Sequence, residues 1–356
     1  MIGPPPNLSD VTPEWLTLAL SQRHPGTVVE AAEFGEAIHG TGTNVALTLR
    51  YARQSGGNPL PTTLWLKGGY EKHFEYMAPS RIYEIESLFY RELAPRLDVR
   101  VPLCYYAGND EVTHQGLMLL ENLAANGASF GNATRPVSPD TVARGLTTLA
   151  RLHASSWGHD WPQAHWYVEQ GIPSAGPQAA WYRDQTPEVF VRYIAERAEA
   201  CTPAGINAPE RIVSAFWKLA AMSREAPRCL IHSDSHLDNF YFDAGGEPGL
   251  IDWQSPRLGC WAWDVSYFII SALDIDVCRR HERALLGHYL EALAAGGVAA
   301  PRMEDAWLAY RRYNAYGLFV KIVNPDMFKP RAINVAWMSR HVAAAQALDT
   351  FASLGV

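Results

Sequence analysis

The sequence lacks an excess of positive charge. Its 30 Lys and Arg residues are outnumbered by 37 Asp and Glu residues, which gives a formal net charge of −7 at pH 7. Proteins bind nucleic acids largely through Lys and Arg contacts to phosphate. This charge balance therefore argues against nucleic acid as the principal partner.

Long apolar runs are absent as well. The richest stretch, Val265–Leu273, is much shorter than the roughly 20 residues that a membrane-spanning helix needs. The N-terminus, MIGPPPNLSDVTPEW, has no basic stretch followed by an apolar run, the pattern of a secretory signal peptide. We therefore expect a cytoplasmic protein with no membrane partner. No feature of the sequence indicates an oligomeric state.

Cysteine is sparse, and some common motifs are missing. There is no Cys-x-x-Cys pair, and an odd number of cysteines in a long chain predicts buried thiols. The absence of Gly-x-x-x-x-Gly-Lys-Ser/Thr excludes a P-loop nucleotide site. The cysteines are Cys104, Cys201, Cys229, Cys260 and Cys278.

The first third of the chain has the pattern of a small β-rich unit. A helix capped by Ser9 or Thr12 comes first, and strands are predicted where apolar and polar residues alternate or where short apolar runs end at Gly or Pro. The predicted strands are 45–51, 63–67, 103–107 and 116–120, and a helix is predicted over 81–93.

The rest of the chain is mainly helical by periodicity. Helices are predicted over 141–157 with Ser138 as cap, and over 177–197, 209–224, 265–273, 277–295 and 304–323. One β excursion interrupts them, at 230–231, 239–242 and 249–251. We therefore predict an α+β fold with an N-terminal lobe over 1–121, a hinge over 122–126 and a C-terminal lobe over 127–356.

The candidate chemistry lies in His232-Ser233-Asp234-Ser235-His236-Leu237-Asp238-Asn239 and in Ile251-Asp252-Trp253-Gln254. Phosphoryl transfer needs a carboxylate for the attacking hydroxyl and oxygen ligands for Mg²⁺. Asp234 is the candidate base, and Asn239 follows at the spacing of kinase catalytic loops. Asp252 lies at the end of a predicted strand, and a β-turn before that strand would bring Asp252 back beside this loop. Asn239 and Asp252 are therefore the candidate metal ligands.

This motif resembles the aminoglycoside phosphotransferase and choline-kinase-like superfamily, whose catalytic loop reads His-Gly-Asp-x-x-x-x-Asn. The continuation GLIDWQSPRLGCWAWDVSYFI resembles the ecdysteroid-kinase-like and related bacterial branches. The resemblance runs from about Gly35 to Phe268. It implies a protein-kinase-like two-lobed fold, ATP as phosphoryl donor with GTP not excluded, Mg²⁺, and a small-molecule acceptor with a hydroxyl group.

The resemblance also assigns nucleotide-binding residues. Lys67 ends a strand, as does the family lysine that neutralises the α- and β-phosphates. ESLFYRELAP resembles the helix whose Glu pairs with that lysine, which favours Glu86 with Glu84 as the reserve. GLMLLENL resembles the strand that enters the hinge, so backbone groups of Glu121 and Leu123 are expected at the adenine edge.

A glycine-containing turn, Gly40-Thr41-Gly42-Thr43-Asn44, is the candidate phosphate loop. Gly40 and Gly42 permit a close approach of the backbone to phosphate. Thr41, Thr43 and Asn44 can donate hydrogen bonds. The turn is less glycine-rich than that of protein kinases.

Several neighbouring residues receive supporting roles. By resemblance, Asp264 braces the catalytic loop, and His232 is expected to hold that loop through its ring. Ser233 stands where the family usually has Gly, which puts the local backbone geometry in question. The active site is expected in a cleft between the two lobes, and Trp253 and Trp261 are predicted to line this cleft.

Two alternatives stay open at this stage. One is a non-catalytic homologue that binds nucleotide, and the other is a metal-dependent hydrolase that uses His232-x-Asp234-x-His236.

The charge of the C-terminal segment bears on the charge of the acceptor molecule. Between Pro301 and Val356 the cations Arg302, Arg311, Arg312, Lys321, Lys329, Arg331 and Arg340 exceed the anions Glu304, Asp305, Asp326 and Asp349 by three. This excess favours a neutral or anionic acceptor over a polycationic one. Hydroxy acids, acyl thioesters, sterol-like alcohols, sugars and natural products are candidates.

Overall fold

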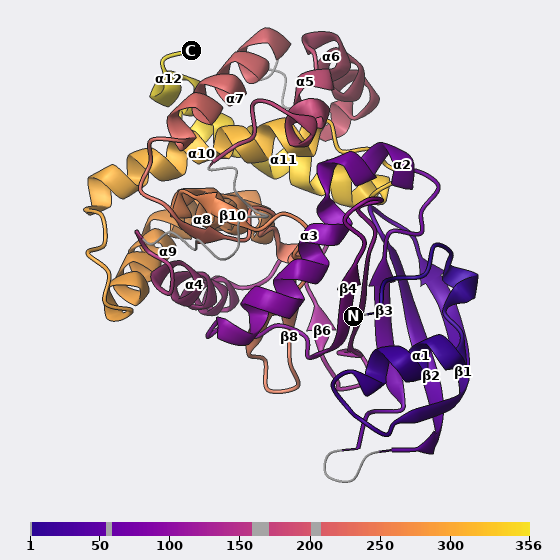
Figure 1. Cartoon of the computed structure of the whole chain (residues 1–356). Helices are drawn as coiled ribbons and strands as arrows, with labels where there is room; N and C mark the ends of the chain where they lie inside the picture. The colour runs from indigo at the N-terminus through magenta and orange to yellow at the C-terminus, as the bar shows by residue number, and fades with distance from the viewer. Residues whose placement is uncertain (1, 55–58, 159–170, 201–207) are drawn as a thin grey trace. The chain divides into compact units, whose positions relative to one another are not determined.

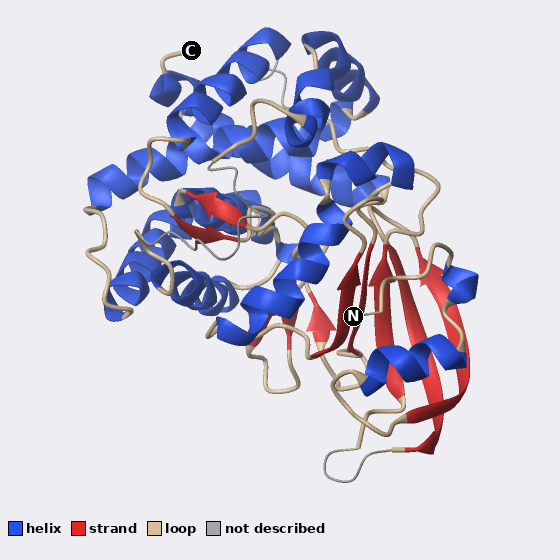
Figure 2. Cartoon of the chain, viewed as in Figure 1, coloured by secondary structure: helices blue, strands red, loops and turns tan. Residues whose placement is uncertain are grey.

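The computed structural model describes residues 2–54, 59–158, 171–200 and 208–356. The chain forms two compact units (Figures 1 and 2). Unit 1 comprises Met1–Leu97, Val101–Ala128 and Asp252–Ser255, and unit 2 comprises Asp98–Arg100, Ser129–Ile251 and Pro256–Val356. The division is not contiguous in sequence, and the lobe boundaries at 121 and 127 stay a prediction.

Unit 1 is built on a five-stranded antiparallel sheet with the order β1-β2-β3-β5-β4. Val45, Leu47 and Leu49 alternate with more exposed residues along β2 and are buried, because successive side chains of a strand point to opposite faces. The strands are β1 (Val28–Ile38), β2 (Thr43–Arg53), β3 (Thr63–Gly68), β4 (Cys104–Asn109) and β5 (Gly116–Glu121).

Helix α1 (Pro13–Ser21) contributes Leu16 and Leu20 to the hydrophobic core beneath this sheet. The Thr12 side chain accepts a hydrogen bond from the Trp15 N–H, which confirms Thr12 as the cap. The other helices of unit 1 are α2 (Phe74–Met77) and α3 (Ile82–Leu88), and α3 continues as a π-helical turn over Phe89–Leu93. Short 3-10 turns lie at Leu8–Asp10, Ala78–Ser80 and Ala94–Arg96.

Unit 2 is mainly helical. Every residue of α8 (Trp261–Ala272) is buried, so this helix forms the centre of the unit. Helices α4, α9, α10 and α11 contact it. The remaining helices are α4 (Pro139–Ala154, with the Ser138 cap confirmed), α5 (Ala180–Asp184), α6 (Pro187–Glu196), α7 (Pro209–Ser223), α9 (Ile275–Ala295), α10 (Met303–Ile322), α11 (Arg331–Ala347) and α12 (Thr350–Leu354).

Two small antiparallel sheets interrupt these helices. One has the order β6-β8-β9 and the other pairs β10 with β7. The loop between β7 and β8 is residues 232–239, so the candidate catalytic residues lie between two buried strands. The strands are β6 (Ser129–Phe130), β7 (Cys229–Ile231), β8 (Phe240–Phe242), β9 (Pro248–Leu250) and β10 (Arg257–Gly259), and 3-10 turns lie at Pro177–Ala179, Ala198–Ala200 and Leu237–Asn239.

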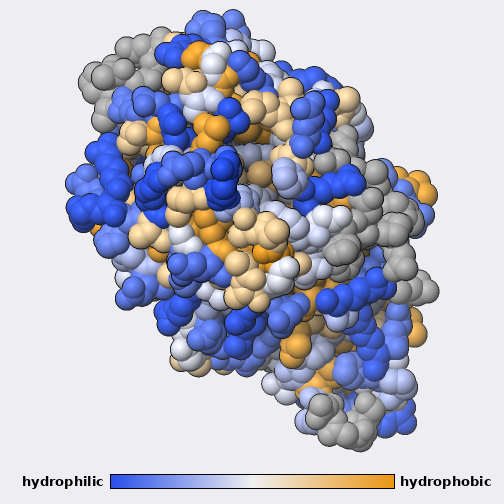
Figure 3. Space-filling model, turned by 90° about the vertical axis from the view of Figure 1, so that its left-hand side faces the viewer, coloured by the Kyte–Doolittle hydropathy of each residue, from blue (hydrophilic) through white to orange (hydrophobic). Residues whose placement is uncertain are grey.

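The surface and the cysteines can be compared with what the sequence predicts, namely no membrane-spanning helix and buried thiols. Hydrophilic residues predominate on the face drawn in Figure 3, with apolar residues in smaller groups. No helix within the described ranges is both long and apolar enough to span a membrane. The thiols of Cys229, Cys260 and Cys278 are buried and that of Cys104 is half-buried, none of them in a disulfide, whereas Cys201 lies outside the described residues.

Candidate active site

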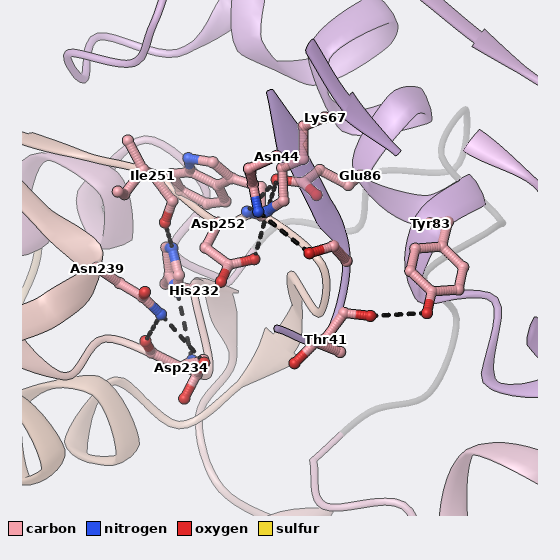
Figure 4. Close-up of polar contacts among 12 residues, drawn as sticks. Thr41, Asn44, Lys67, Tyr83, Glu86, His232, Asp234, Asn239, Ile251 and Asp252 are labelled. Carbon is pink, nitrogen blue, oxygen red and sulfur yellow. Dashed lines mark hydrogen bonds and ion pairs between the residues drawn. The ribbon is translucent and has the colours of Figure 1, made fainter. Parts of the chain in front are cut away.

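The loop after β7 brings Asp234 and Asn239 together (Figure 4). The Asn239 amide nitrogen donates to the Asp234 carbonyl at 2.7 Å and to its carboxylate at 3.0 Å. The Asp234 side chain is 37% exposed, so a small molecule can reach it. Burial opposes its charged form, but the contact with His236 and the Lys321 charge outweigh burial and lower the pKa of Asp234 below its ordinary value. Asp234 is therefore an ionised acceptor at neutral pH.

Asp264, on α8, braces this loop from a fully buried position. Its carboxylate oxygens accept the backbone N–H groups of His232 at 2.7 Å and Ser233 at 2.8 Å, and its carbonyl accepts the Ser235 hydroxyl at 3.0 Å. His153 lies 3.2 Å from the same carboxylate. The predicted bracing role of Asp264 is confirmed.

Ser233 has a left-handed backbone conformation, with φ of +65°. Glycine adopts this conformation without a steric cost, which explains why glycine is usual at this place. His232 holds the loop through its ring, as predicted. The Asp234 N–H donates to its Nδ1 at 3.3 Å, so the ring proton is on Nε2, which donates to the Ile251 carbonyl at 2.9 Å.

The two candidate metal ligands are tied together through the chain. The Ile251 N–H donates to the Asn239 carbonyl at 3.0 Å, and Asp252 is the next residue after Ile251. The Asn239 amide nitrogen faces Asp234, which leaves the amide oxygen as the atom that could bind a metal. Amide and carboxylate oxygens are the ligands that Mg²⁺ prefers. Each of these two residues therefore carries an oxygen of the kind that suits Mg²⁺.

Lys67, near the end of β3 in unit 1, bridges two carboxylates (Figure 4). Its ammonium donates to Glu86 at 2.8 Å and to Asp252 at 2.7 Å. Burial alone would lower the pKa of Lys67, but these carboxylates raise it to about 12. The alternative carboxylate, Glu84, instead contacts Arg81 and other neighbours. The structure thus pairs Lys67 with Glu86.

Glu86 is fixed from a second side by the Trp253 N–H, which donates to it at 3.0 Å. Burial raises the pKa of Glu86, and the Lys67 ammonium opposes this effect. The Trp253 ring is fully buried and stacks on Phe89 with ring centres 4.0 Å apart. Trp261 is also buried, so the prediction that these two tryptophans line the cleft is wrong, because their large apolar rings pack into the cores.

The candidate phosphate turn connects β1 to β2. The Thr41 carbonyl accepts the Tyr83 hydroxyl at 2.8 Å and lies 3.1 Å from His73 Nε2 (Figure 4). A Cβ atom on Gly42 would lie 3.2 Å from the Gly68 carbonyl oxygen, so a side chain there would crowd β3. Gly40 comes directly before Thr41 and Gly42, the two residues of the turn with these contacts. Side chains from the α2–α3 region therefore hold the turn.

The polar side chains of the turn are also engaged. Thr43 is buried and its hydroxyl donates to Glu71 at 2.6 Å, so its single proton is used within unit 1. The Asn44 amide donates to the Gly42 carbonyl at 3.2 Å. Both groups therefore donate to partners within the protein, and their predicted contacts with phosphate stay predictions.

At the predicted hinge, the Leu123 N–H donates to the Glu121 carbonyl at 3.1 Å. The Glu121 N–H donates to the Leu103 carbonyl, and its carboxylate accepts from the Asn126 amide. An adenine acceptor would have to replace the bond made by the Leu123 N–H. The adenine role of Glu121 and Leu123 stays a prediction.

An aromatic cluster next to Asp234 was not predicted. His236 Nε2 lies 3.5 Å from the Asp234 carboxylate, and its ring packs against Tyr267 and Trp337. The Lys321 ammonium lies over the Trp337 ring, 3.5 Å from its centre. The sequence does contain a signal for this cluster, the lysine within the apolar run Leu-Phe-Val-Lys-Ile-Val. Lysine is rarely buried unless it is paired, so a lysine in such a run indicates a partner for its ammonium inside the protein.

The hydrolase alternative lacks support. Within the described ranges, no group of three or more His, Cys, Asp or Glu side chains is arranged to hold a metal ion. The His232 ring is used to hold the loop, and the His236 ring packs in the aromatic cluster.

An antiparallel sheet with a Lys–Glu pair, together with a helical unit that carries an Asp–Asn loop, defines a protein-kinase-like phosphotransferase fold. Two solved structures share it, each at 13% identity and a TM-score of 0.51. A spectinomycin phosphotransferase in complex with ADP and spectinomycin matches over 97% of this chain and 99% of its own. An ethanolamine kinase from Plasmodium vivax matches over 89% of this chain and 82% of its own.

The sequence pattern of the Ecdysteroid kinase-like family matches residues 44–296, and the chain belongs to this family. A comparison with curated proteins gave no match. The predicted superfamily and the α+β, protein-kinase-like fold are therefore confirmed. Family and fold together indicate a small-molecule phosphotransferase.

Proposed function

We propose that this protein transfers the γ-phosphoryl group of ATP to a hydroxyl group of a small molecule. The observation that carries this proposal is the Lys67 ammonium, which is held between Glu86 and Asp252 at 2.8 and 2.7 Å. Phosphotransferases of this fold need a lysine–glutamate pair for the phosphates and an aspartate for the metal. The contacts of Lys67 with Glu86 and Asp252 support these roles for the three residues.

The residues have distinct roles in this reaction. Asp234 accepts the proton of the acceptor hydroxyl, whose oxygen forms the new bond to the γ-phosphorus. The bond from that phosphorus to the β–γ bridging oxygen breaks, and ADP leaves. Lys67 neutralises phosphate charge, and the turn from Gly40 to Asn44 positions the phosphates. Asp264 keeps the Asp234 loop in place through the backbone of His232 and Ser233.

Mg²⁺ fits the proposal as the partner of Asn239 and Asp252. When bound, it supplies charge neutralisation for the phosphate oxygens. Asn239 also donates to the Asp234 carboxylate, which fixes the direction in which that carboxylate points. One residue would thus orient the base and contribute a metal ligand.

Nucleotide binding and turnover test the proposal separately. Wild type should show a Mg²⁺-dependent thermal shift with ATP, with GTP as a comparison, because a ligand at a hundred times its dissociation constant stabilises a protein by about 2.7 kcal/mol. Asp252→Ala should lose the Mg²⁺ dependence of this shift. Asp234→Asn should keep nucleotide binding and lose ATP-dependent phosphorylation by orders of magnitude in a screen of hydroxylated metabolites. No nucleotide shift in wild type would rule the proposal out, and nucleotide binding without turnover would favour the non-catalytic alternative.

A further inference from the structure

Lys321 is a buried cation that lies on aromatic rings inside unit 2. The residue is only 5% exposed. Its ammonium lies 3.5 Å from the centre of the Trp337 ring and 5.0 Å from the centre of the Tyr267 ring. An ammonium over the face of an aromatic ring is attracted by the negative charge of that face, most strongly to Trp. These rings therefore form a site for a cation, and the protein fills it with its own side chain.

This cation site adjoins the candidate base. The ring centres of Trp337 and Tyr267 lie 4.6 and 5.8 Å from that of His236. His236 Nε2 in turn lies 3.5 Å from the Asp234 carboxylate. Burial and then the Lys321 charge lower the pKa of His236, and the contact with His236 and then the Lys321 charge lower the pKa of Asp234. An acceptor molecule that reaches Asp234 therefore meets the field of this ammonium.

The other basic residues after Pro301 have different surroundings. Five of them are engaged with carboxylates or carbonyls elsewhere in unit 2, so the net positive charge of this segment is not spread evenly around Asp234. These five are Arg302 with Asp305, Arg311 with the Leu348 carbonyl, Arg312 with the Ser353 carbonyl, Arg331 with Glu199, and Arg340 with the carbonyls of Ala133 and Ser271.

We propose that Lys321 is a built-in cation that fills the aromatic site beside Asp234, so that the acceptor presents a neutral or anionic group there and not an ammonium. A second cation would find the aromatic faces occupied and would be repelled by Lys321. The part of this inference that concerns the acceptor rests on the proposed phosphotransfer. The part that concerns the cation site occupied by Lys321 does not depend on catalysis.

The first experiment tests the cation site without any reaction. Lys321→Ala removes the ammonium and leaves the aromatic rings, whereas Lys321→Met removes the charge and keeps most of the volume. Ethylammonium chloride should raise the melting temperature of K321A above that in an equal concentration of sodium chloride, and it should not do so for wild type or K321M. Arg283→Ala is a matched control, because Arg283 lies over Trp307 at the surface and its removal leaves no enclosed site. Equal responses of K321A and wild type would overturn the proposal.

The second experiment measures acceptor preference. Matched acceptors share one carbon skeleton and carry an amine, a hydroxyl or a carboxylate at the same position. Wild type should favour the neutral or acidic member over the amine by about tenfold or more in kcat/KM, and K321M should lose most of that preference. A wild-type preference for the amine, or an unchanged preference in K321M, would overturn the proposal. If ATP binds but no acceptor is phosphorylated, the proposed function fails, and the response to ethylammonium alone decides the inference.

Discussion

Tyr83 and Glu86 lie three residues apart on α3 and hold two different parts of unit 1. The Tyr83 hydroxyl donates to the Thr41 carbonyl at 2.8 Å, and Glu86 accepts from Lys67 at 2.8 Å. Residues three apart on a helix lie on the same face. One turn of α3 therefore links the candidate phosphate turn to the lysine that is expected to meet the phosphates. Movement of this helix would displace both together.

Removal of the Tyr83 hydroxyl should weaken nucleotide binding. Tyr83→Phe keeps the stacking of the ring on Phe74 but leaves the Thr41 carbonyl without its 2.8 Å donor. A hydrogen bond of this kind contributes about 0.5–1.5 kcal/mol, so the dissociation constant for Mg²⁺–ATP should rise up to about tenfold. The turnover number at saturating ATP should change little. Nucleotide titration and steady-state kinetics measure the two quantities.

Tyr310→Phe is the matched control for this prediction. Tyr310 is also buried, and its hydroxyl donates to Glu282 in unit 2. Its removal should affect stability without a change in nucleotide affinity. Equal nucleotide affinity in Y83F and wild type would show that the turn does not depend on α3.

Much of the catalytic loop could be predicted because its residues are close together in sequence. The spacing of Asp234 and Asn239 and the short β8–β9 hairpin that returns to Asp252 are local features. Glu86 could be chosen over Glu84 only by resemblance. The structure gives the physical reason, since Glu86 faces Lys67 and Glu84 faces Arg81.

Elements that depend on distant partners were missed. β1 (Val28–Ile38) contains three Glu, three Ala and a Gly, a composition with little strand preference. It forms a strand because it pairs along β2. Helix α11, which carries Trp337, was not predicted either, so the contact between Lys321 and this ring could not be anticipated.

Asp264→Asn should destabilise unit 2. The two carboxylate oxygens accept the backbone N–H groups of His232 and Ser233, but a carboxamide offers only one oxygen. One buried N–H then loses its partner, at a cost of about 1–3 kcal/mol. Urea unfolding measures this cost. The control is Asp276→Asn, whose side chain is 80% exposed and which should change stability by less than about 0.5 kcal/mol. Equal stability of the two variants would mean that Asp264 does not brace the loop.

Ser233→Gly should stabilise the protein. Ser233 has φ of +65°, where a side chain costs about 1–2 kcal/mol relative to glycine. The larger freedom of glycine in the unfolded chain offsets part of this gain, which leaves about 0.5–1 kcal/mol. Ser235→Gly, two residues along the same loop, should instead destabilise, because it removes the hydroxyl that donates to the Asp264 carbonyl. Denaturant midpoints of both variants test the prediction, and a loss of stability in S233G would contradict it.

Acid should destabilise the protein in part through His341. This ring is fully buried, and its Nδ1 lies 2.8 Å from the Asn314 side-chain oxygen. The Asn314 amide nitrogen donates to the His341 carbonyl, so its side-chain oxygen is the acceptor and the ring proton is on Nδ1. Burial, with the positive charges of Lys321 and Arg340 and the neighbouring His236, lowers the pKa of His341 well below 6.5.

The direction of the pH effect follows from this lowered pKa. Below pH 6.5 the unfolded chain binds a proton at His341 that the folded chain does not bind. The free energy of unfolding therefore decreases as the pH is lowered. Between pH 7.5 and 5.5 this single group should remove about 1.4 kcal/mol. Urea unfolding at both pH values measures the loss in wild type and in His341→Asn. Other titrating groups affect both proteins, so the difference between the two losses isolates His341, and equal losses would show that the buried ring does not control this part of the pH dependence.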